Sequence, residues 1–479
     1  MAGSRRGSNS NASDRKGSRA GAQMRGRQRQ RGMQAPLDAR PFDAVIDRLS
    51  HDGRGIARWR DKTLFVSGAL PSETVTVKQT SAHSKFNEAK ALDIIARSPE
   101  RVEPVCEYYG RCGGCDLQHL AIEAQVVAKE KAVLDQLSRW GGLTPSTVLP
   151  PLRSKPEGYR ARARLAVQWT KAGEPLLGFR EAGSKQVVAI SSCAILDPRL
   201  EKLIAPLNDW LKAIARNRPV THIELTADDN STSAVIRHNR PLLENDLAIL
   251  AQLSKTHTFN VFRQLESGGS LLDLNGYECD PRLNYQLPAM SESDDGLTIA
   301  FHPLDFIQVN PDLNRQMVSQ AMSLLDISKG DKVADLFCGV GNFTLPMAKR
   351  ASEVIGIEAQ ESMVVRGREN AKAQGLDTVR FVAADLEKPM ASALLGRGDV
   401  DAMLLDPPRS GAAGAMPLIA QLSPAKLVYI SCNPSTLARD AKSLAEQGYQ
   451  LEVLGIMDMF PHTSHVESMA LFIRNQENT

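Results

Sequence analysis

Short apolar runs alternate with helical segments from about Phe301 to the end of the chain, and this alternation restricts the fold more than any other feature. A helical segment at 361–375, for example, separates two of the runs. Strands that alternate with helices form βαβ units, which build a mostly parallel sheet. The sequence therefore predicts an α/β fold for residues 299–479. The strand-like runs are 332–337, 354–358, 379–383, 402–405 and 427–430.

A glycine turn follows the first of these runs, in Cys338-Gly339-Val340-Gly341-Asn342. Glycines allow the backbone to approach a ligand closely, and the following helix N-terminus favours negative groups, so a pyrophosphate would also fit. However, an acid lies in or just after each of the first four runs. S-Adenosylmethionine carries a sulfonium and an amine rather than phosphates, so this acidic edge predicts S-adenosylmethionine. The four acids are Asp335, Glu358, Asp385 and Asp406.

Cys432 follows the fifth strand-like run and is a candidate nucleophile. Ligands of an open α/β sheet bind at the carboxyl ends of its strands, where this thiol is expected. Beside a methyl donor, a thiolate that attacks C6 of uracil makes C5 an enolate-like carbon that can accept a methyl group. The target base would have to leave its stack to reach the thiol. Glu467 is a candidate for the base that removes the C5 proton.

Residues 1–37 consist mainly of Gly, Ser, Asn, Gln and Arg, a composition that predicts disorder. The first 35 residues hold nine Lys or Arg against one acid, Asp14, which gives a net charge of +8. Because the whole chain carries +3, the remainder carries −5. The tail is therefore either an arm that binds nucleic-acid phosphates or a solubilising segment.

Residues 38–98 contain closely spaced β-type runs with turn signals between them, which predicts a small β-barrel. The segment resembles the TRAM domain, an OB-like barrel of RNA-modifying enzymes, and this resemblance implies a platform for nucleic acid. Composition alone is equally consistent with a barrel that serves only as a spacer. The runs are 42–46, 63–66, 74–77 and 91–95.

Residues 99–298 form a middle region in which a helix-like stretch at 121–140 precedes β-type segments, and we expect an α+β domain. In this region Arg160, Arg162 and Arg164 alternate with alanines, so a strand would place all three on one face. Two interpretations are open. The arginines face RNA phosphates, or they protect an edge strand from aggregation.

Seven cysteines in 479 residues do not make a disulfide framework, and their clustering indicates a metal or catalytic use in a reducing compartment. Cys106, Cys112 and Cys115 have the spacing C-x5-C-x2-C. Three thiolates need a fourth ligand, for which Cys193 is the best candidate and Cys279 a weaker one. Four cysteines hold either zinc or a four-iron cluster, and the spacing leaves both open.

Four motifs together resemble the RNA (uracil-5-)-methyltransferase family: Phe306-Ile307-Gln308-Val309-Asn310, Asp406-Pro407-Pro408-Arg409, Ser431-Cys432-Asn433-Pro434 and His465-Val466-Glu467. The resemblance implies a Rossmann-like class I methyltransferase domain in which Cys432 is the nucleophile and Glu467 the base. It also implies a donor site. The residues implied to line it are Gln308, Phe337, Asn342, Glu358, Asp385 and Asp406.

The pattern Cys-x5-Cys-Gly-Gly-Cys-Asp with a distant fourth cysteine resembles the 23S rRNA branch of the same family. This resemblance implies a [4Fe–4S] cluster that shapes the protein or the RNA, because methyl transfer moves no electrons. It implies 23S rRNA as the partner. The ligands it implies are Cys106, Cys112, Cys115 and Cys193.

Three other functions remain open. Barrel-bearing enzymes of this type also methylate tRNA uridines, a methyltransferase fold can persist in a non-catalytic RNA-binding Fe–S protein, and Asp406-Pro407-Pro408 resembles a motif of amino-methyltransferases. The last two have no use for the thiol of Cys432. No apolar run approaches the roughly 20 residues of a membrane helix, so we expect a cytoplasmic protein that needs no membrane. We also expect a monomer that needs no obligate protein partner.

Overall fold

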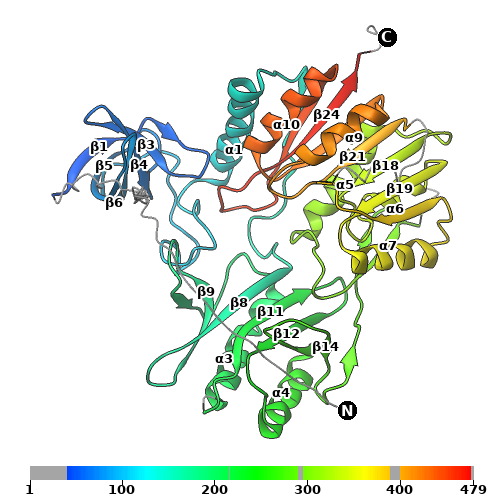
Figure 1. Cartoon of the computed structure of the whole chain (residues 1–479). Coiled ribbons are helices and arrows are strands. Elements are labelled where there is room, and N and C mark those ends of the chain that lie inside the picture. Colours follow the sequence, from blue (N-terminus) through cyan, green and yellow to red (C-terminus); the bar gives the residue numbers. More distant parts are fainter. Residues whose placement is uncertain (1–39, 215, 290–294, 389–399, 476–479) are drawn as a thin grey trace, which may run out of the picture.

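The computed structural model describes residues 40–214, 216–289, 295–388 and 400–475. These residues form a small barrel, a central α+β region and a large C-terminal α/β domain (Figure 1). The basic tail predicted at 1–37 lies outside the described residues. Within the described ranges, every helix is too short or too polar to cross a membrane.

The barrel is built from six strands in the order β1-β5-β6-β4-β3-β2. Its alternating small and β-branched residues point inward, and Leu64, Val66, Val75 and Val77 are fully buried. The predicted runs correspond to β1, β4, β5 and β6, whereas β3 begins at Gly55, at the end of a segment predicted as a turn. The strands are β1 Phe42–Val45, β2 Arg48–Leu49, β3 Gly55–Trp59, β4 Lys62–Ser67, β5 Thr74–Ala82 and β6 Phe86–Ala96.

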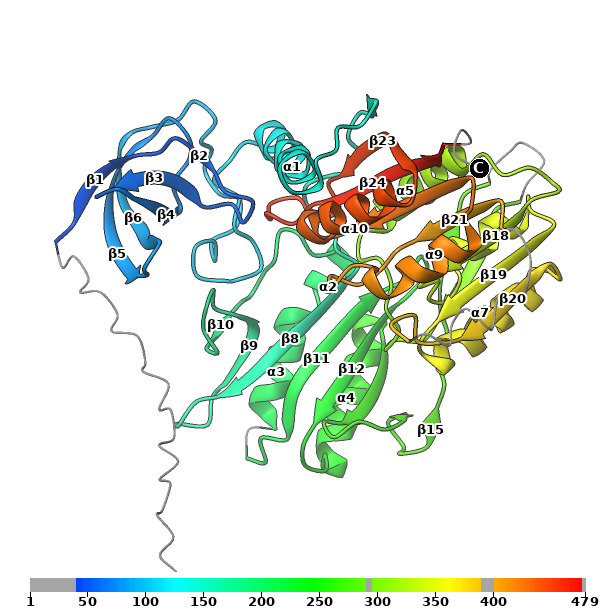
Figure 2. The ribbon, with the colours of Figure 1, turned by 45° about the horizontal axis from the view of Figure 1, so that its top comes forward.

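The central region is an eight-stranded mixed sheet in the order β10-β9-β8-β11-β12-β13-β14-β15. Three helices cover one face of it, and Trp210 of the second helix and Leu250 of the third are buried (Figures 1 and 2). The strands are β8 Arg162–Trp169, β9 Pro175–Arg180, β10 Val187–Ala189, β11 Val220–Ala227, β12 Thr232–His238, β13 Asn260–Leu265, β14 Leu271–Leu272 and β15 Glu278–Cys279; the helices are α2 Pro198–Glu201, α3 Ile204–Ala213 and α4 Glu244–His257. A hairpin of β16 (Leu283–Leu287) and β17 (Leu297–Phe301) leads into the C-terminal domain.

The C-terminal domain has the predicted α/β architecture. Its sheet has the order β20-β19-β18-β21-β22-β24-β23-β7, in which the first five strands are parallel and β24 is antiparallel to β22 and β23. The strands are β18 Lys332–Leu336, β19 Glu353–Glu358, β20 Val379–Ala383, β21 Ala402–Leu405, β22 Lys426–Ser431, β23 Tyr449–Met457 and β24 Glu467–Arg474.

Helices flank this sheet on both faces, as the βαβ pattern requires (Figure 2). Asn310 caps α5 by accepting a hydrogen bond from the Leu313 amide at 3.3 Å, and Pro311 at the first helical position lacks an amide hydrogen. The helices are α5 Pro311–Leu325, α6 Thr344–Ala348, α7 Glu361–Ala373, α9 Met416–Leu422 and α10 Pro434–Glu446, with a 3-10 turn at Ala413–Ala415.

One segment of the predicted middle region packs on the C-terminal domain. Helix α1 (Ile122–Gln136) continues into a π-helical turn (Leu137–Gly141) that contacts α10, and Figure 1 shows α1 beside α10. The two-residue strand β7 (Thr147–Val148) then pairs with β23 at the edge of the sheet. The chain therefore crosses the C-terminal domain before it enters the central sheet.

Candidate active site and cysteine cluster

The glycine turn after β18 is shaped by backbone geometry that few residues tolerate. Phe337, Gly339 and Gly341 have φ values of +66°, +58° and +101°. A Cβ atom at Gly341 would lie 3.0 Å from Leu345 Cγ and 3.1 Å from Phe381 Cζ. Any larger residue at Gly341 would therefore be strained and crowded.

Glu358, at the end of β19, is held against this turn by backbone amides. Its carboxylate accepts hydrogen bonds from the Gly339 amide at 3.2 Å and from the Gln360 amide at 2.9 Å. The carboxylate is therefore fixed at the carboxyl edge of the sheet, where an acid can bind ribose hydroxyls.

Asn342 is tied to two side chains that the motifs do not include. Its Oδ1 accepts hydrogen bonds from Tyr285 Oη at 2.9 Å and from Asn314 Nδ2 at 3.0 Å, and its Nδ2 donates to Asn314 Oδ1 at 2.9 Å. Asn314 belongs to α5 and Tyr285 to β16, so Asn342 joins the glycine turn to two other elements. No local pattern in the sequence singles out these partners.

A buried acid and a half-buried acid lie beneath the turn. Asp335 in β18 is fully buried and accepts a hydrogen bond from Thr344 Oγ1 at 2.6 Å. Asp406, after β21, lies 3.5 Å from Gln308 Nε2. Burial raises the pKa of each carboxyl to about 7, and the charge of Asp406 also raises that of Asp335. The second carboxylate oxygen of Asp335 has no hydrogen-bond partner among the described residues.

Asp385 differs from these acids. It lies just beyond β20, and its side chain is partly exposed and forms an ion pair with Lys388 at 3.0 Å. The hydrogen bond from Lys388 lowers the pKa of Asp385, so this carboxyl is ionised at neutral pH. The structure thus places one exposed anion and two easily protonated acids along one sheet edge.

Gln308 lies in the loop before α5, and the central region holds that loop in place. The Ala161 amide donates to Val309 O at 2.7 Å, and Arg162 donates to the carbonyls of Pro303, at 2.6 Å, and Asp305. Arg162 and Arg164 both face Glu224 on β11 at 3.7 Å. Two of the three predicted arginines are thus paired with an acid of the protein, and β8 lies inside the sheet rather than at its edge.

The sheet register brings Cys432 and Glu467 together. β22 and β24 are antiparallel, with Ser431 opposite Ser468 as their last pair. Cys432 comes one residue after Ser431 and Glu467 one residue before Ser468, so the two occupy facing positions. Cβ atoms of facing residues in antiparallel strands lie about 4.5–5.5 Å apart.

Burial favours the protonated form of both groups of this pair. Burial raises the pKa of Glu467 to about 8 and that of Cys432 to about 11, and the charge of Glu467 contributes to the second shift. The positive charge of Arg409 opposes both shifts. Glu467 is only 6 % exposed, so little solvent reaches its carboxyl.

Arg409 and His465 complete the surroundings of the thiol. Arg409 Nη2 lies 2.8 Å from His465 Nδ1, and its carbonyl accepts a hydrogen bond from Asn433 Nδ2 at 3.0 Å. Burial and the charge of Arg409 lower the pKa of His465. Both residues belong to the sequence motifs, but the contact between them was not predicted.

Cys106, Cys112, Cys115 and Cys193 lie close enough together for their charges to interact. Burial raises the pKa of Cys115 to about 12 and of Cys193 to about 11, and the charges of Cys106 and Cys112 contribute to both shifts. The segment that bears the first three cysteines is attached to β9, since the Gly113 amide donates to Arg180 O at 2.9 Å. Cys193 follows β10, the neighbour of β9.

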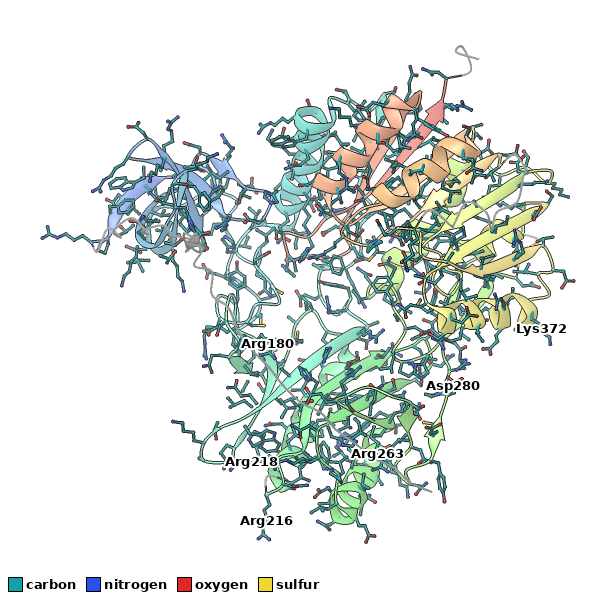
Figure 3. All side chains as sticks on the ribbon, in the orientation of Figure 1. Arg180, Arg216, Arg218, Arg263, Asp280 and Lys372 are labelled. Atoms are coloured by element: carbon teal, nitrogen blue, oxygen red, sulfur yellow. The ribbon has the colours of Figure 1, made fainter. Side chains whose placement is uncertain are left out.

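Cys279 lies at the opposite edge of the central sheet, in β15. Figure 3 shows this separation: Arg180 lies near the cysteine segment, whereas Asp280, next to Cys279, lies toward α7. Cys193 is therefore the fourth member of the group. Among the described residues, however, no set of three or more His, Cys, Asp or Glu side chains is arranged closely enough to hold a metal ion.

The parallel sheet, the glycine turn and the acidic strand ends define a class I S-adenosylmethionine-dependent methyltransferase. The model of the tRNA (uracil-5-)-methyltransferase family matches residues 289–475, and that of the TRAM domain matches residues 41–92. The fold is also that of a solved structure, the tRNA (uracil-54, C5)-methyltransferase of Pyrococcus abyssi in complex with S-adenosyl-L-homocysteine. That structure is 24 % identical, with a TM-score of 0.68, and covers 90 % of this chain and 100 % of its own.

Among curated proteins, the 23S rRNA (uracil(1939)-C(5))-methyltransferase RlmD of Alkalilimnicola ehrlichii is 44 % identical and covers 95 % of this chain and 100 % of the relative. The enzyme of the same name from Alcanivorax borkumensis is 43 % identical, with coverage of 91 % and 97 %. The chain therefore belongs to the RNA uracil-C5-methyltransferase family, as its motifs predicted, and its N-terminal barrel is a TRAM domain.

Proposed function

We propose that the protein methylates C5 of a uridine in 23S ribosomal RNA, at the position corresponding to the uracil 1939 for which its bacterial relatives are named. The observation that carries the proposal is the facing pair of Cys432 and Glu467 beside the acidic donor edge. Relatives named for this rRNA position share 43–44 % of their residues with the chain, whereas the solved tRNA enzyme shares 24 %.

S-Adenosylmethionine would supply an electrophilic methyl group. Asp406 is positioned to stabilise the positive charge of the donor, and Glu358 its ribose hydroxyls. Asp335 and Asp406 release their protons more readily when a cation approaches, because its positive charge offsets the burial that raises their pKa. The residues proposed to hold the donor are Gln308, Phe337, Asn342, Glu358, Asp385 and Asp406.

In the first step, the Cys432 thiol loses its proton to solvent, and the thiolate sulfur forms a bond to C6 of the flipped uracil. The electrons of the C5–C6 double bond move onto C5 and its carbonyl. Arg409 favours the thiolate, since its charge opposes the upward pKa shift of Cys432. C5 then bonds to the methyl carbon while the bond from that carbon to the donor sulfur breaks, which leaves S-adenosylhomocysteine.

In the second step, the Glu467 carboxylate takes the proton from C5. The electrons of that C–H bond restore the C5–C6 double bond and expel the Cys432 thiolate. A base is required because C5 carries both a methyl group and a proton after the transfer. The burial of Glu467 suits this role, because a carboxyl with a pKa of about 8 is a stronger base than an exposed one.

We also propose that Cys106, Cys112, Cys115 and Cys193 hold a [4Fe–4S] cluster. Four half-buried thiols lie within electrostatic reach of one another, and their thiolate forms would repel unless a cationic group neutralised them. The residue types suit zinc as well as iron and sulfide, and the Cys-Gly-Gly-Cys-Asp motif favours the cluster. Anaerobic purification should yield a brown protein that contains iron and inorganic sulfide. Colourless protein with stoichiometric zinc would refute the cluster.

The substrate is tested by transfer of labelled methyl from S-adenosylmethionine to protein-free 23S rRNA and to bulk tRNA in parallel. We expect label in 23S rRNA, at one uridine that digestion and mass spectrometry identify. Label confined to tRNA would overturn the substrate. Label on an exocyclic amine would overturn the reaction.

The barrel and the basic residues of 1–37 are proposed to bind RNA away from the reacting base. Arginine-rich segments bind through phosphate contacts, and such binding weakens steeply as salt rises. Removal of residues 1–37 should therefore reduce the slope of RNA affinity against salt and leave S-adenosylmethionine binding unchanged. An unchanged slope would assign the tail a role other than RNA binding.

A further inference from the structure

The loop 458–466 joins β23 to β24 and leads directly into Glu467. It also carries His465, which contacts Arg409. The position of the proposed base therefore depends on how this loop is held. His462 has a φ of +68°, a left-handed conformation that a non-glycine residue adopts only when its surroundings hold it there.

The segment 106–117, which bears Cys106, Cys112 and Cys115 and is called the cysteine segment, holds the middle of this loop. The amides of Asp116 and Leu117 both donate to His462 O, at 3.1 and 2.9 Å. In return the two carboxylate oxygens of Asp116 accept hydrogen bonds from the Ser464 amide at 2.6 Å and from Ser464 Oγ at 2.7 Å. Asp116 therefore contacts His462 through its main chain and Ser464 through its side chain. It lies one residue after Cys115.

The helix that follows the cysteine segment adds buried contacts to the same loop. Gln125 Oε1 accepts a hydrogen bond from the His462 amide at 2.8 Å, while its Nε2 donates to the carbonyls of Leu117 and Leu120. Lys129 donates to Asp458 at 2.6 Å and to Phe460 O at 3.0 Å. The segment 116–129 therefore contacts the loop from residue 458 to residue 464.

The barrel also packs against Leu117 and Ser464. Gly53 has a φ of +77°, and a Cβ atom there would lie 3.0 Å from Leu117 Cδ2 and 3.2 Å from Ser464 Cβ. The barrel, the cysteine segment and the loop before Glu467 are thus in contact around Asp116. A displacement of the cysteine segment would be transmitted to the loop.

We propose that Asp116 is a positioning residue of the methyl-transfer reaction, which couples the cysteine cluster to the placement of Glu467. The inference rests on the proposed function, because it assigns Glu467 the removal of the C5 proton. The cysteine segment thereby has a defined role, since it orders the catalytic loop without entering the chemistry. The Asp116 carboxylate is bonded to Ser464 and not to Cys432 or Glu467, so Asp116 acts on the reaction through Ser464 and the loop.

A change at Asp116 should slow the removal of the C5 proton by Glu467. Attack by Cys432 and methyl transfer do not require Glu467, whereas release of the thiolate does. A displaced Glu467 therefore leaves the methylated uridine bonded to Cys432, and a covalent protein–RNA adduct accumulates. Misplacement of a catalytic group by about 1 Å can cost a factor of about 100. For one exposed carboxylate whose neighbouring amides still hold the loop, we expect a loss of about tenfold.

The test compares Asp116→Ala with Asp116→Asn in the full-length protein. Asp116 is exposed, so neither change disturbs the core. The asparagine retains an acceptor for the Ser464 amide, and its Nδ2 can donate to Ser464 Oγ, so it should restore most of the activity. Glu107→Ala is a matched control, because Glu107 is an exposed acid one residue after Cys106 as Asp116 is one residue after Cys115.

Four quantities are measured: turnover on 23S rRNA, KM for the RNA, the amount of denaturation-resistant protein–RNA adduct, and the metal content of each variant. Asp116→Ala should lower kcat about tenfold, raise the adduct, and leave KM and metal content unchanged. The control should match the unaltered chain. Unchanged turnover, or a loss of metal in step with activity, would overturn the inference. A lack of methyl transfer by the unaltered chain would refute the proposed function and the inference with it.

Discussion

Cys432 and Glu467 face each other across the antiparallel strands β22 and β24, one position beyond the last pair, Ser431 and Ser468. The proposed nucleophile and the proposed base are therefore placed by the ladder of a central sheet rather than by two independent loops. Such a ladder fixes the separation of facing side chains. Although the two residues are 35 positions apart in the chain, one register brings them together, and a slip by one residue would destroy it.

Replacement of Cys432 by alanine should abolish methyl transfer, because no other group can form the bond to C6. Binding of S-adenosylmethionine should persist, since Gln308 and Asp406 remain in place. The measurement is labelled methyl transfer together with calorimetric binding of the donor. Cys279→Ala is the matched control, a half-buried cysteine in β15 that should retain full activity. Residual transfer by Cys432→Ala would refute covalent catalysis.

Activity should rise with pH through about 8. Glu467 acts as a base only when ionised, and burial raises its pKa to about 8, so most of it is protonated at pH 7. The Cys432 thiol, with its pKa of about 11, adds a rise in the same direction. The measurement is kcat/KM for RNA from pH 6 to 9. Glu467→Gln should accumulate the covalent adduct and lose the rise near pH 8. A profile that falls over this range would contradict the assignment of Glu467 as the base.

The parts of the structure that follow from local pattern were predictable. The apolar runs correspond to β18 to β22 within a residue or two, and the acids and Cys432 lie at the predicted sheet edge. The barrel strand β3 was missed because its start, Gly55, belongs to a glycine-rich stretch that is typical of turns. Its glycine is required by packing instead, since a Cβ there would lie 2.8 Å from Ile46 Cγ2.

Contacts between distant segments were not predictable from one sequence. Asp116 and Ser464 are 348 residues apart, and each is an ordinary polar residue by itself. Arg162 and Arg164 were interpreted as facing RNA or protecting an edge, because Glu224, the acid that pairs with them, belongs to a neighbouring strand that the pattern does not place. Only the fold supplies these partners.

The donor should bind with release of protons between pH 6 and 8. Asp335 and Asp406 have pKa values raised to about 7, so each is partly protonated there, and the positive sulfonium of the donor favours their ionised forms. Affinity for S-adenosylmethionine should therefore increase with pH. S-Adenosylhomocysteine lacks the sulfonium charge and is the control. Calorimetry in buffers of different ionisation enthalpy measures the protons released. Equal pH dependence for the two ligands would contradict this electrostatic account.

The buried ion pair of Lys129 and Asp458 should be a major determinant of stability. Both side chains are at most 3 % exposed, and their charged atoms lie 2.6 Å apart. Burial lowers the pKa of Lys129, whereas the charge and the hydrogen bond of Asp458 oppose this shift and favour the ammonium form. Removal of one partner leaves the charge of the other unpaired in the core. Lys129→Met or Asp458→Asn should therefore each lower the free energy of unfolding by about 3–5 kcal/mol.

The double variant Lys129→Met/Asp458→Asn should cost much less than the sum of the two single changes, because it leaves no unpaired charge behind. Thermal unfolding of the three variants measures this. The exposed pair of Lys212 and Asp209 in α3, 2.8 Å apart, is the matched control, and its removal should change stability by less than about 1 kcal/mol. Additive losses for the buried pair would mean that the two side chains do not stabilise each other, and that Lys129 acts through its hydrogen bond to Phe460 O.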